Sequence, residues 1–210
     1  MNNFGRTLII ALVLLGTLLW TSSPALADSA TYTETAVATG SLGGTPFTDA
    51  LITITLVGDP SASVPIGFFG AVGVFGPATV TVEGIGTASF TDSLAVFDSA
   101  SPIFGDAAGI TDSSVGLDVL DTLDATFGTY DLTTNIGPIT NLSAFNPDDG
   151  SCFACFATTD GNFALTSQNS GTSTFSASTA VPEPSSLLLL GVGLSGLFLA
   201  RRKKTRSATA

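Results

Sequence analysis

Two cysteines form the most recognisable chemical pattern in the chain. Cys152 and Cys155 are spaced as C-x-x-C, a spacing used by redox centres that sit on a βαβ unit and by zinc sites that have further Cys or His ligands. The chain contains only these two Cys and no His. Turn-forming residues flank the pair on both sides, so we predict a disulfide that pins a loop in an oxidising compartment.

Aspartates make up the second group of residues with chemical capacity. Calcium binds to several oxygen ligands on a bent backbone, which makes Asp118, Asp121 and Asp124 candidate calcium ligands. Their spacing matches no EF-hand loop. The alternative, which we favour, is that they are solvated surface carboxylates, and no other cofactor is expected.

Catalysis is not expected from these residue types. Residues 28–200 contain no Lys, Arg or His, so a nucleophilic serine would lack its usual base. Paired carboxylates can hydrolyse glycosides, but the only Trp is Trp20 and the only tyrosines are Tyr32 and Tyr130. Aromatic platforms for sugar are therefore scarce, and we predict that the chain is not an enzyme.

The charge distribution excludes one class of partner. All six basic residues lie near the two ends, at Arg6 and within residues 201–206, whereas the chain has 17 acidic residues. A purely acidic body repels phosphate backbones, so nucleic-acid binding is not expected. The same body attracts cations.

Hydrophobic residues with a period of two predict β-strands in the middle of the chain. Ile52, Ile54 and Leu56 alternate with threonines, as do Val80 and Val82. We expect further strands at residues 32–39, 88–97 and 127–133, and a hairpin of residues 163–167 and 172–178 around a turn at 168–171. The three-residue spacing of leucines within residues 114–126 predicts one short helix. Turn signals between these segments indicate an all-β body over residues 28–180, an antiparallel sandwich or barrel, and we favour a β-sandwich of the jelly-roll or Ig-like kind.

The N-terminus reads as a signal peptide over residues 1–27. Arg6 precedes an apolar helix at residues 7–20, and Ala25-Leu26-Ala27 supplies the small-x-small pattern that signal peptidase cleaves. Cleavage is expected between Ala27 and Asp28. The alternative is an uncleaved N-terminal anchor.

The C-terminus, residues 181–206, has three consecutive parts. Val181, Pro182, Glu183 and Pro184 precede an apolar stretch that ends in the cluster Arg201, Arg202, Lys203 and Lys204. As a helix, residues 185–200 would span about 24 Å, close to the lower limit for crossing a bilayer. The basic cluster predicts a cytoplasmic stop-transfer signal and hence an exported body.

This order of Pro-Glu-Pro motif, apolar helix and basic stop resembles the PEP-CTERM sorting signal. The resemblance implies recognition and processing by an exosortase, after a stage in which the C-terminal helix holds the protein in the membrane. It also implies delivery to the cell surface or the extracellular matrix. A plain transmembrane anchor with a coincidental Pro-Glu-Pro is the alternative.

Export signals and an acidic β-rich body together suggest a surface or extracellular-matrix protein, structural or adhesive in a biofilm. Signal peptidase and exosortase are the expected processing enzymes, and exopolysaccharide or matrix proteins are the expected partners. The alternative function is a membrane-anchored module that binds calcium or carbohydrate.

Overall fold

Alternating side chains organise the strands of this domain, beginning with the central strand β1 (Ala30–Leu42). Tyr32, Glu34 and Ala36 point into the interior, while Thr33 and Thr35 point outward. Branched threonine side chains fit the pleated surface of a sheet well. The computed structural model describes residues 29–67, 71–101, 105–152 and 154–179.

The described residues form twelve β-strands and two short 3₁₀ helices, and no α-helix occurs among them. Beyond β1 the strands are β2 (Thr45–Gly58), β3 (Val64–Pro65), β4 (Val72–Phe75), β5 (Ala78–Val82), β6 (Gly86–Ser89), β7 (Leu94–Ser101), β8 (Gly105–Asp112), β9 (Leu117–Leu123), β10 (Ile136–Ala144), β11 (Cys155–Thr158) and β12 (Gly161–Thr179). The 3₁₀ helices are η1 (Pro60–Ala62) and η2 (Ala125–Thr129). The all-β prediction is confirmed for this part of the chain.

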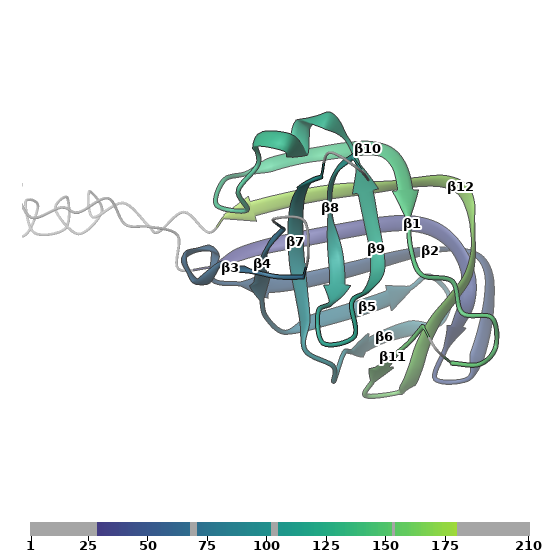
Figure 1. The fold of residues 1–210 in the computed structure, drawn as a ribbon. Coiled ribbons are helices and arrows are strands. Elements are labelled where there is room, and N and C mark those ends of the chain that lie inside the picture. Colours follow the sequence, from purple (N-terminus) through teal and green to yellow (C-terminus); the bar gives the residue numbers. More distant parts are fainter. Residues whose placement is uncertain (1–28, 68–70, 102–104, 153, 180–210) are drawn as a thin grey trace, which may run out of the picture. The chain divides into compact units, whose positions relative to one another are not determined.

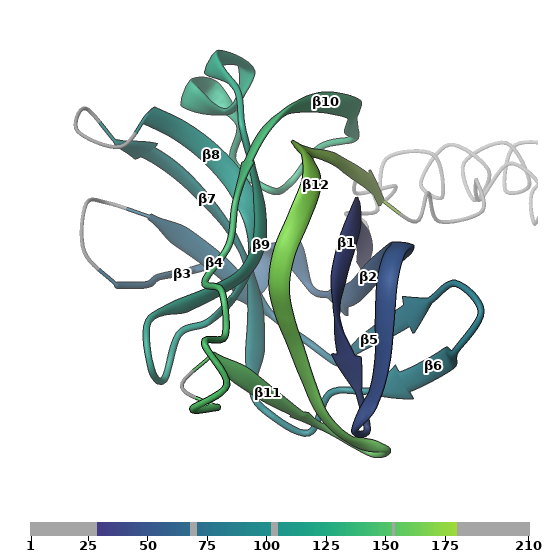
Figure 2. The same cartoon turned by 90° about the vertical axis from the view of Figure 1, so that its right-hand side faces the viewer.

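The strands belong to one antiparallel sheet that curls around the core (Figure 1). Their order is β3-β4-β7-β8-β9-β10-β12-β1-β2-β5-β6, with β11 paired to β12. Figure 2 shows β10 passing between the two halves of this sheet. Residues 136–142 of β10 pair with β12, and its last two residues pair with β9. The predicted β-sandwich is therefore not confirmed, because a continuous hydrogen-bonded path replaces two separate sheets.

Aromatic side chains fill much of the interior. Phe175 packs edge-to-face against Phe127 and Tyr130, with ring centroids 5.5 and 6.2 Å away. The buried Tyr32 hydroxyl donates a hydrogen bond of 2.7 Å to the carbonyl of Leu132. The core thus joins β1 and β12 to η2 and the segment that follows it.

The predicted helix over residues 114–126 is wrong. Leu117 and Leu120 lie in strand β9 and enter the core, and Leu123 lies on the opposite face of the sheet. A β-bulge in β9, described below, brings Leu117 and Leu120 to one face despite their three-residue spacing. The strand predicted at 127–133 is also wrong, because its first residues belong to η2.

The predicted hairpin at residues 163–178 is wrong as well. β12 runs unbroken through the expected turn, and its pairing with β1 shifts there, between the pairs Ala36–Ser173 and Ala38–Gln168. The turn-forming residues mark an irregularity in a long strand. The real hairpin lies just before it, between β11 and β12. Both predicted terminal helices lie outside the described residues and receive no support from the structure.

Candidate functional site

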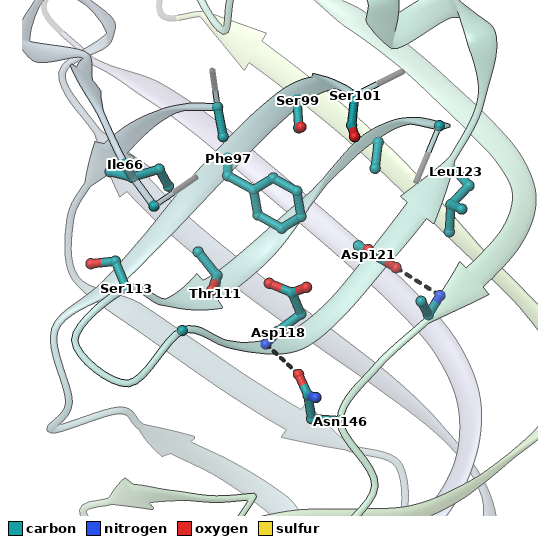
Figure 3. A pocket seen from close by; sticks show the side chains of 16 residues that line it. Ile66, Phe97, Ser99, Ser101, Thr111, Ser113, Asp118, Asp121, Leu123 and Asn146 are labelled. Carbon is teal, nitrogen blue, oxygen red and sulfur yellow. Dashed lines mark hydrogen bonds between the residues drawn. The ribbon is translucent and has the colours of Figure 1, made fainter. Parts of the chain in front are cut away.

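A cavity of about 650 Å³ lies on the face of β7, β8 and β9 that is turned away from the core (Figure 3). On β7, Phe97, Ser99 and Ser101 line the cavity, whereas Val96 between them packs in the core. On β8, Ala107 and Thr111 line the cavity, whereas Ala108 and Ile110 pack in the core. Alternation along the strands gives this part of the sheet one core face and one cavity face.

Gly105 and Ala107 are the small residues of β8 that line the cavity, and Gly109 continues this run of small residues along the strand. Gly109 pairs with Phe97 on one side and with Asp121 on the other. A Cβ at Gly109 would lie 2.4 Å from the carbonyl oxygen of Leu120 and 2.5 Å from the Cβ of Asp121. The glycine therefore lets β8 and β9 approach closely at a place where a larger residue would clash with β9.

A β-bulge in β9 places two carboxyl groups on the cavity face. Ile110 pairs with Leu120, but the next residue, Thr111, pairs with Asp118, so that Val119 is the extra residue. Asp118 and Asp121 would face opposite sides of a regular strand. The bulge turns both toward the cavity, where Figure 3 shows them across from Phe97.

Burial dominates the electrostatics of this pair. The Asp121 side chain is 6% exposed, and its burial, together with repulsion from Asp118, raises the pKa of Asp121 to about 7. A hydrogen bond of 2.6 Å from the backbone N–H of Ala144 opposes that rise in pKa. Burial also raises the pKa of Asp118, against the lowering effect of the Thr111 hydroxyl.

The neighbouring chain segment contributes Asn146 to the cavity wall. Its Oδ1 accepts a hydrogen bond of 2.6 Å from the backbone N–H of Asp118, and the backbone N–H of Asn146 donates to the carbonyl of Asp118. Ile66 and Ala71, which flank an undescribed stretch between β3 and β4, add apolar surface. The lining thus combines hydroxyl, amide, carboxyl and apolar groups, the mixture typical of small-molecule sites.

A second buried acid lies on the core side of β9. The Thr122 hydroxyl donates to Glu34 Oε1 at 2.6 Å and also contacts the Ser173 hydroxyl, which donates to the carbonyl of Asp121. Glu34 Oε2 has no hydrogen-bond partner among the described residues. Burial raises the pKa of Glu34 well above its usual value, with a smaller contribution from the nearby Asp121.

Asp98 is a further buried acid, on the core face of β7. It is 5% exposed, and its Oδ1 finds no hydrogen-bond partner in the described part of the chain. Burial, followed by repulsion from Asp106 and Asp131, raises the pKa of Asp98 to about 7. Since residues 28–200 lack Lys, Arg and His, these buried acids have no cationic side chain within the domain to compensate them.

Only two of the three candidate calcium ligands come together. Asp118 and Asp121 share the cavity, whereas Asp124 lies outside the cavity lining and is partly exposed at the start of η2. Its Oδ1 accepts from the backbone N–H of Thr126 at 2.8 Å, and its Oδ2 accepts from Asn141 at the same distance. Within the described ranges, no group of three or more His, Cys, Asp or Glu side chains is arranged to hold a metal ion.

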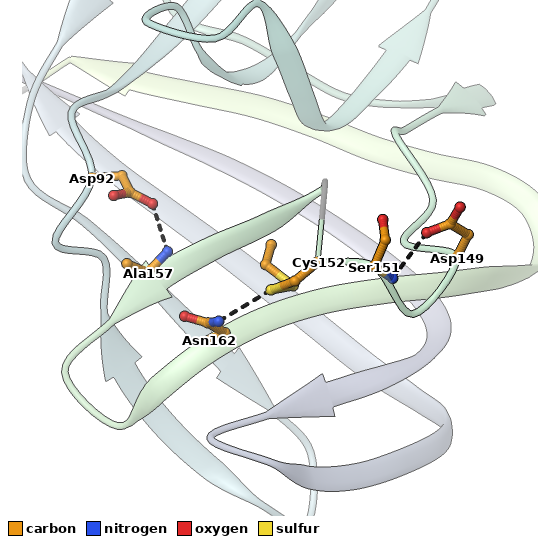
Figure 4. The surroundings of a disulfide bond; sticks show 7 residues. Asp92, Asp149, Ser151, Cys152, Ala157 and Asn162 are labelled. Atoms are coloured by element: carbon orange, nitrogen blue, oxygen red, sulfur yellow. Dashed lines mark hydrogen bonds between the residues drawn. A yellow bond between two sulfur atoms is a disulfide. The ribbon is translucent and has the colours of Figure 1, made fainter.

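Cys152 and Cys155 are joined by a disulfide at the start of β11 (Figure 4). The side-chain amide of Asn162 donates to Cys152 Sγ at 3.2 Å, and Ser151 N–H donates to Asp149 at 3.0 Å. The bonded cysteines thus sit in a loop that leads into the β11–β12 hairpin, away from the cavity residues. This setting has strands and turns where a thioredoxin-like site would have a helix.

The residues predicted to carry the two export signals lie outside the described residues. They are Ala25, Ala27 and Asp28 at the signal cleavage site, Val181, Pro182, Glu183 and Pro184 in the sorting motif, and Arg201, Arg202, Lys203 and Lys204 in the stop-transfer cluster. Among the residues that are described, we find no helix long and apolar enough to cross a bilayer.

Sequence reasoning missed Phe97, Gly109 and Glu34 as notable residues. The alternation of Phe97 with Val96 was a usable signal, because it places the ring on the face opposite the core. Gly109 offered only a glycine within a strand, which can mark a bulge or a close approach. Glu34 carried no signal beyond its position among apolar strand residues.

Comparison with known proteins identifies one segment of the chain. Residues 180–203 match the model described as the PEP-CTERM protein-sorting motif. No curated protein and no solved structure matches the chain. The chain therefore carries a PEP-CTERM sorting motif at residues 180–203, which marks it as an exported protein sorted by an exosortase.

Proposed function

We propose that this exported protein is a non-catalytic component of the cell surface or extracellular matrix, and that its β-domain binds carbohydrate in the β7–β9 cavity. The observation that carries the proposal is the cavity itself. An aromatic ring, Phe97, faces two carboxyl groups across the small residues of β8, and hydroxyl and amide groups surround them. Sugars stack on aromatic rings and exchange hydrogen bonds with carboxyl, amide and hydroxyl groups.

The arrangement of the acids supports binding without hydrolysis. In glycoside hydrolases two carboxyl groups flank the scissile bond from opposite sides. Asp118 and Asp121 both project from the same wall of the cavity, strand β9. Acyl and phosphoryl transfer, whose transition states carry negative charge, would in addition have no Lys, Arg or His within residues 28–200 to stabilise that charge.

The test is binding of the mature protein to purified exopolysaccharides and defined oligosaccharides, measured by isothermal titration calorimetry. Phe97→Ala is the informative variant, because Phe97 lines the cavity and is outside the core cluster. Phe75→Ala on the neighbouring strand β4 controls for loss of a phenyl ring outside the cavity lining. Because Phe97 is 7% exposed and Phe75 is 39% exposed, the melting curve of each variant must show that it is folded. We expect saturable binding that is lost in the first variant and retained in the second.

Two results would contradict the proposal. Absence of binding to every carbohydrate tested would remove the binding role. Release of new reducing ends during the titration would show that the protein is an enzyme, because each hydrolysed glycosidic bond exposes one.

Calcium is the second candidate ligand, because the bulge directs Asp118 and Asp121 into one cavity. Carboxylate oxygens are the ligands that calcium prefers. A rise in the melting temperature with millimolar calcium, absent in Asp118→Asn, would favour this candidate. An equal response to magnesium would indicate general charge screening.

A further inference from the structure

The acids of the β7–β9 cavity lack any cation of their own. Among the cavity residues described above, Asp118 and Asp121 are the titratable ones, and both are largely removed from water. The other ionisable side chains of the surrounding strands are also acids, namely Asp98 on β7, Asp106 and Asp112 on β8, and Glu34 on β1. A positive charge at this position must therefore come from a ligand.

The pairing of β7, β8 and β9 sets the distance between Phe97 and Asp121. Phe97, Gly109 and Asp121 form one row across β7, β8 and β9. Because neighbouring strands lie about 4.8 Å apart, the backbones of β7 and β9 are separated by about 10 Å at this row. Phe97 and Asp121 both line the cavity, whose volume of about 650 Å³ is within the range of small-molecule sites and can hold a sugar ring.

Charge narrows the choice among sugars. A uronic acid or a phosphorylated sugar would bring a further acidic group to a site that already holds two. A neutral sugar would bring no charge that favours the ionised form of either carboxyl group, which burial and repulsion from the neighbouring acid disfavour. An ammonium group on the ring would favour that ionised form, while the apolar face of the ring packs against Phe97.

A bare metal ion fits this lining less well than an organic cation does. Two carboxyl groups from one strand supply few of the oxygen ligands that calcium takes. Ile66, Ala71, Phe97 and Leu123 add apolar surface, which a hydrated ion cannot use but the carbon skeleton of an organic ligand can.

We propose that the cavity binds a sugar with a free primary amine, whose ammonium group pairs with Asp118 and Asp121 while its ring packs on Phe97. The inference rests on the proposed carbohydrate-binding function and adds the class of sugar. Such units occur in partly deacetylated hexosamine polymers, so the matching partner is a polysaccharide that carries free amines.

The experiment compares three oligosaccharides of equal length by calorimetry with the mature protein at neutral pH. They are oligomers of glucosamine, of N-acetylglucosamine and of glucose. We expect the glucosamine oligomer to bind at least tenfold more tightly than the other two. A linear polyamine of the same charge should bind at least tenfold more weakly than the glucosamine oligomer, because it has no ring to pack on Phe97.

Two variants separate the cavity from the general acidity of the domain. In the double variant Asp118→Asn and Asp121→Asn, the preference for the free amine should disappear. Asp124→Asn removes the same kind of charge outside the cavity lining and should leave the preference intact. Loss of the two buried charges should not hinder folding, and the melting curve of each variant verifies this.

The outcomes distinguish the inference from the function on which it rests. If no oligosaccharide binds, the proposed carbohydrate-binding function fails. If the neutral or acetylated oligomers bind as tightly as the amine, carbohydrate binding stands and the amine preference is wrong. Equal binding of the linear polyamine, or an equal loss in Asp124→Asn, would also overturn the inference, since either would indicate non-specific attraction to an acidic protein.

Discussion

Buried carboxyl groups without cationic partners are the most unusual residues of this domain. Glu34, Asp98 and Asp121 are each at least 94% buried, and their pKa values lie above the usual range of carboxyl groups. A buried acid in most proteins is paired with Arg or Lys, but residues 28–200 contain neither. These acids therefore favour the protonated form, and their ionisation at higher pH opposes folding.

Asp121→Asn should increase the stability of the protein above neutral pH. The folded protein holds a proton on Asp121 up to about pH 7, whereas the unfolded chain loses it near pH 4. Between these values the folded state binds more protons, so the free energy of unfolding falls as pH rises. Because each tenfold difference in proton affinity corresponds to about 1.4 kcal/mol, the variant should be more stable by on the order of 4 kcal/mol at pH 8 and nearly unchanged at pH 4. Its Asn side chain can still accept the hydrogen bond from Ala144.

Urea unfolding at pH 4, 6 and 8 measures this effect. Asp124→Asn is the control: hydrogen bonds from Thr126 lower the pKa of the partly exposed Asp124, so this variant should keep the pH dependence of the wild type above pH 4. Because Glu34 and Asp98 remain, the Asp121 variant should still lose some stability as pH rises. An Asp121 variant as pH-dependent as the wild type would show that Asp121 ionises normally in the folded protein.

Strand β9 is the element on which both the core and the cavity depend. Its bulge sends Leu117, Val119 and Leu120 into the core while Asp118 and Asp121 face the cavity. Without the bulge, one of the two acids would have to enter the core. The position of the cavity carboxyl groups is therefore a property of the strand as a whole.

Leu120→Ala should destabilise the protein by about 2–5 kcal/mol, because it removes a fully buried side chain next to the bulge. Leu142→Ala is the matched control in the neighbouring strand β10, where the side chain is 64% exposed. That change should cost less than about 0.5 kcal/mol. Chemical denaturation of both variants gives the comparison, and similar losses for the two would contradict the assigned register of β9.

Regular alternation made several elements predictable from the sequence. The threonine-rich segments at β1, β2 and β5 alternate strictly, and each forms a strand near the expected position. Irregular strands were not predictable in this way. In β9, leucines with a spacing typical of a helix lie in a strand that contains a bulge. In β12, the residues that suggested a hairpin turn lie at a register shift inside one strand. In both cases pairing with distant strands overrides the local pattern.

The cavity was only partly predictable for the same reason. Asp118 and Asp121 were recognisable as candidate ligands by residue type, but Asp124 was grouped with them by proximity in sequence alone. Their separation follows from the end of β9 at Leu123 and the start of η2. Phe97 lies near Asp121 because Gly109 pairs with both residues across β7, β8 and β9. The local sequence does not reveal this pairing.

At the scale of the whole molecule, the described domain carries charge of one sign. Residues 28–180 contain acidic side chains and no Lys, Arg or His. Self-repulsion keeps such a protein soluble and also destabilises its compact state. The chain has a net charge of −11 at pH 7, which favours partners that carry positive charge.

Monovalent salt should raise the melting temperature of the mature protein over the whole range of concentrations tested. Salt screens the repulsion among carboxylates, and residues 28–180, which lack basic side chains, offer no side-chain salt bridges for the same salt to weaken. Scanning calorimetry at pH 7.5 between 10 and 500 mM NaCl, about a sevenfold change in Debye length, gives the measurement. Potassium chloride should act equally, because screening does not depend on which cation is present. A melting temperature that falls with salt would contradict this description of the electrostatics.

Export brings the β-domain to the place where its proposed polysaccharide partners are found. The matched motif at residues 180–203 follows the last described strand directly, so processing within the motif would separate the β-domain from the C-terminal segment. The proposed carbohydrate-binding role of the cavity requires that the domain reach polysaccharide outside the cell.

The most direct test is the intact mass and location of the mature protein in hosts with and without the exosortase. We predict a product that begins at Asp28, ends near Pro182-Glu183-Pro184 and is released only when the enzyme is present. Replacing these three motif residues by Ala should abolish release in the host that has the enzyme. A product that keeps residues 201–206 and stays in the membrane of both hosts would contradict the account.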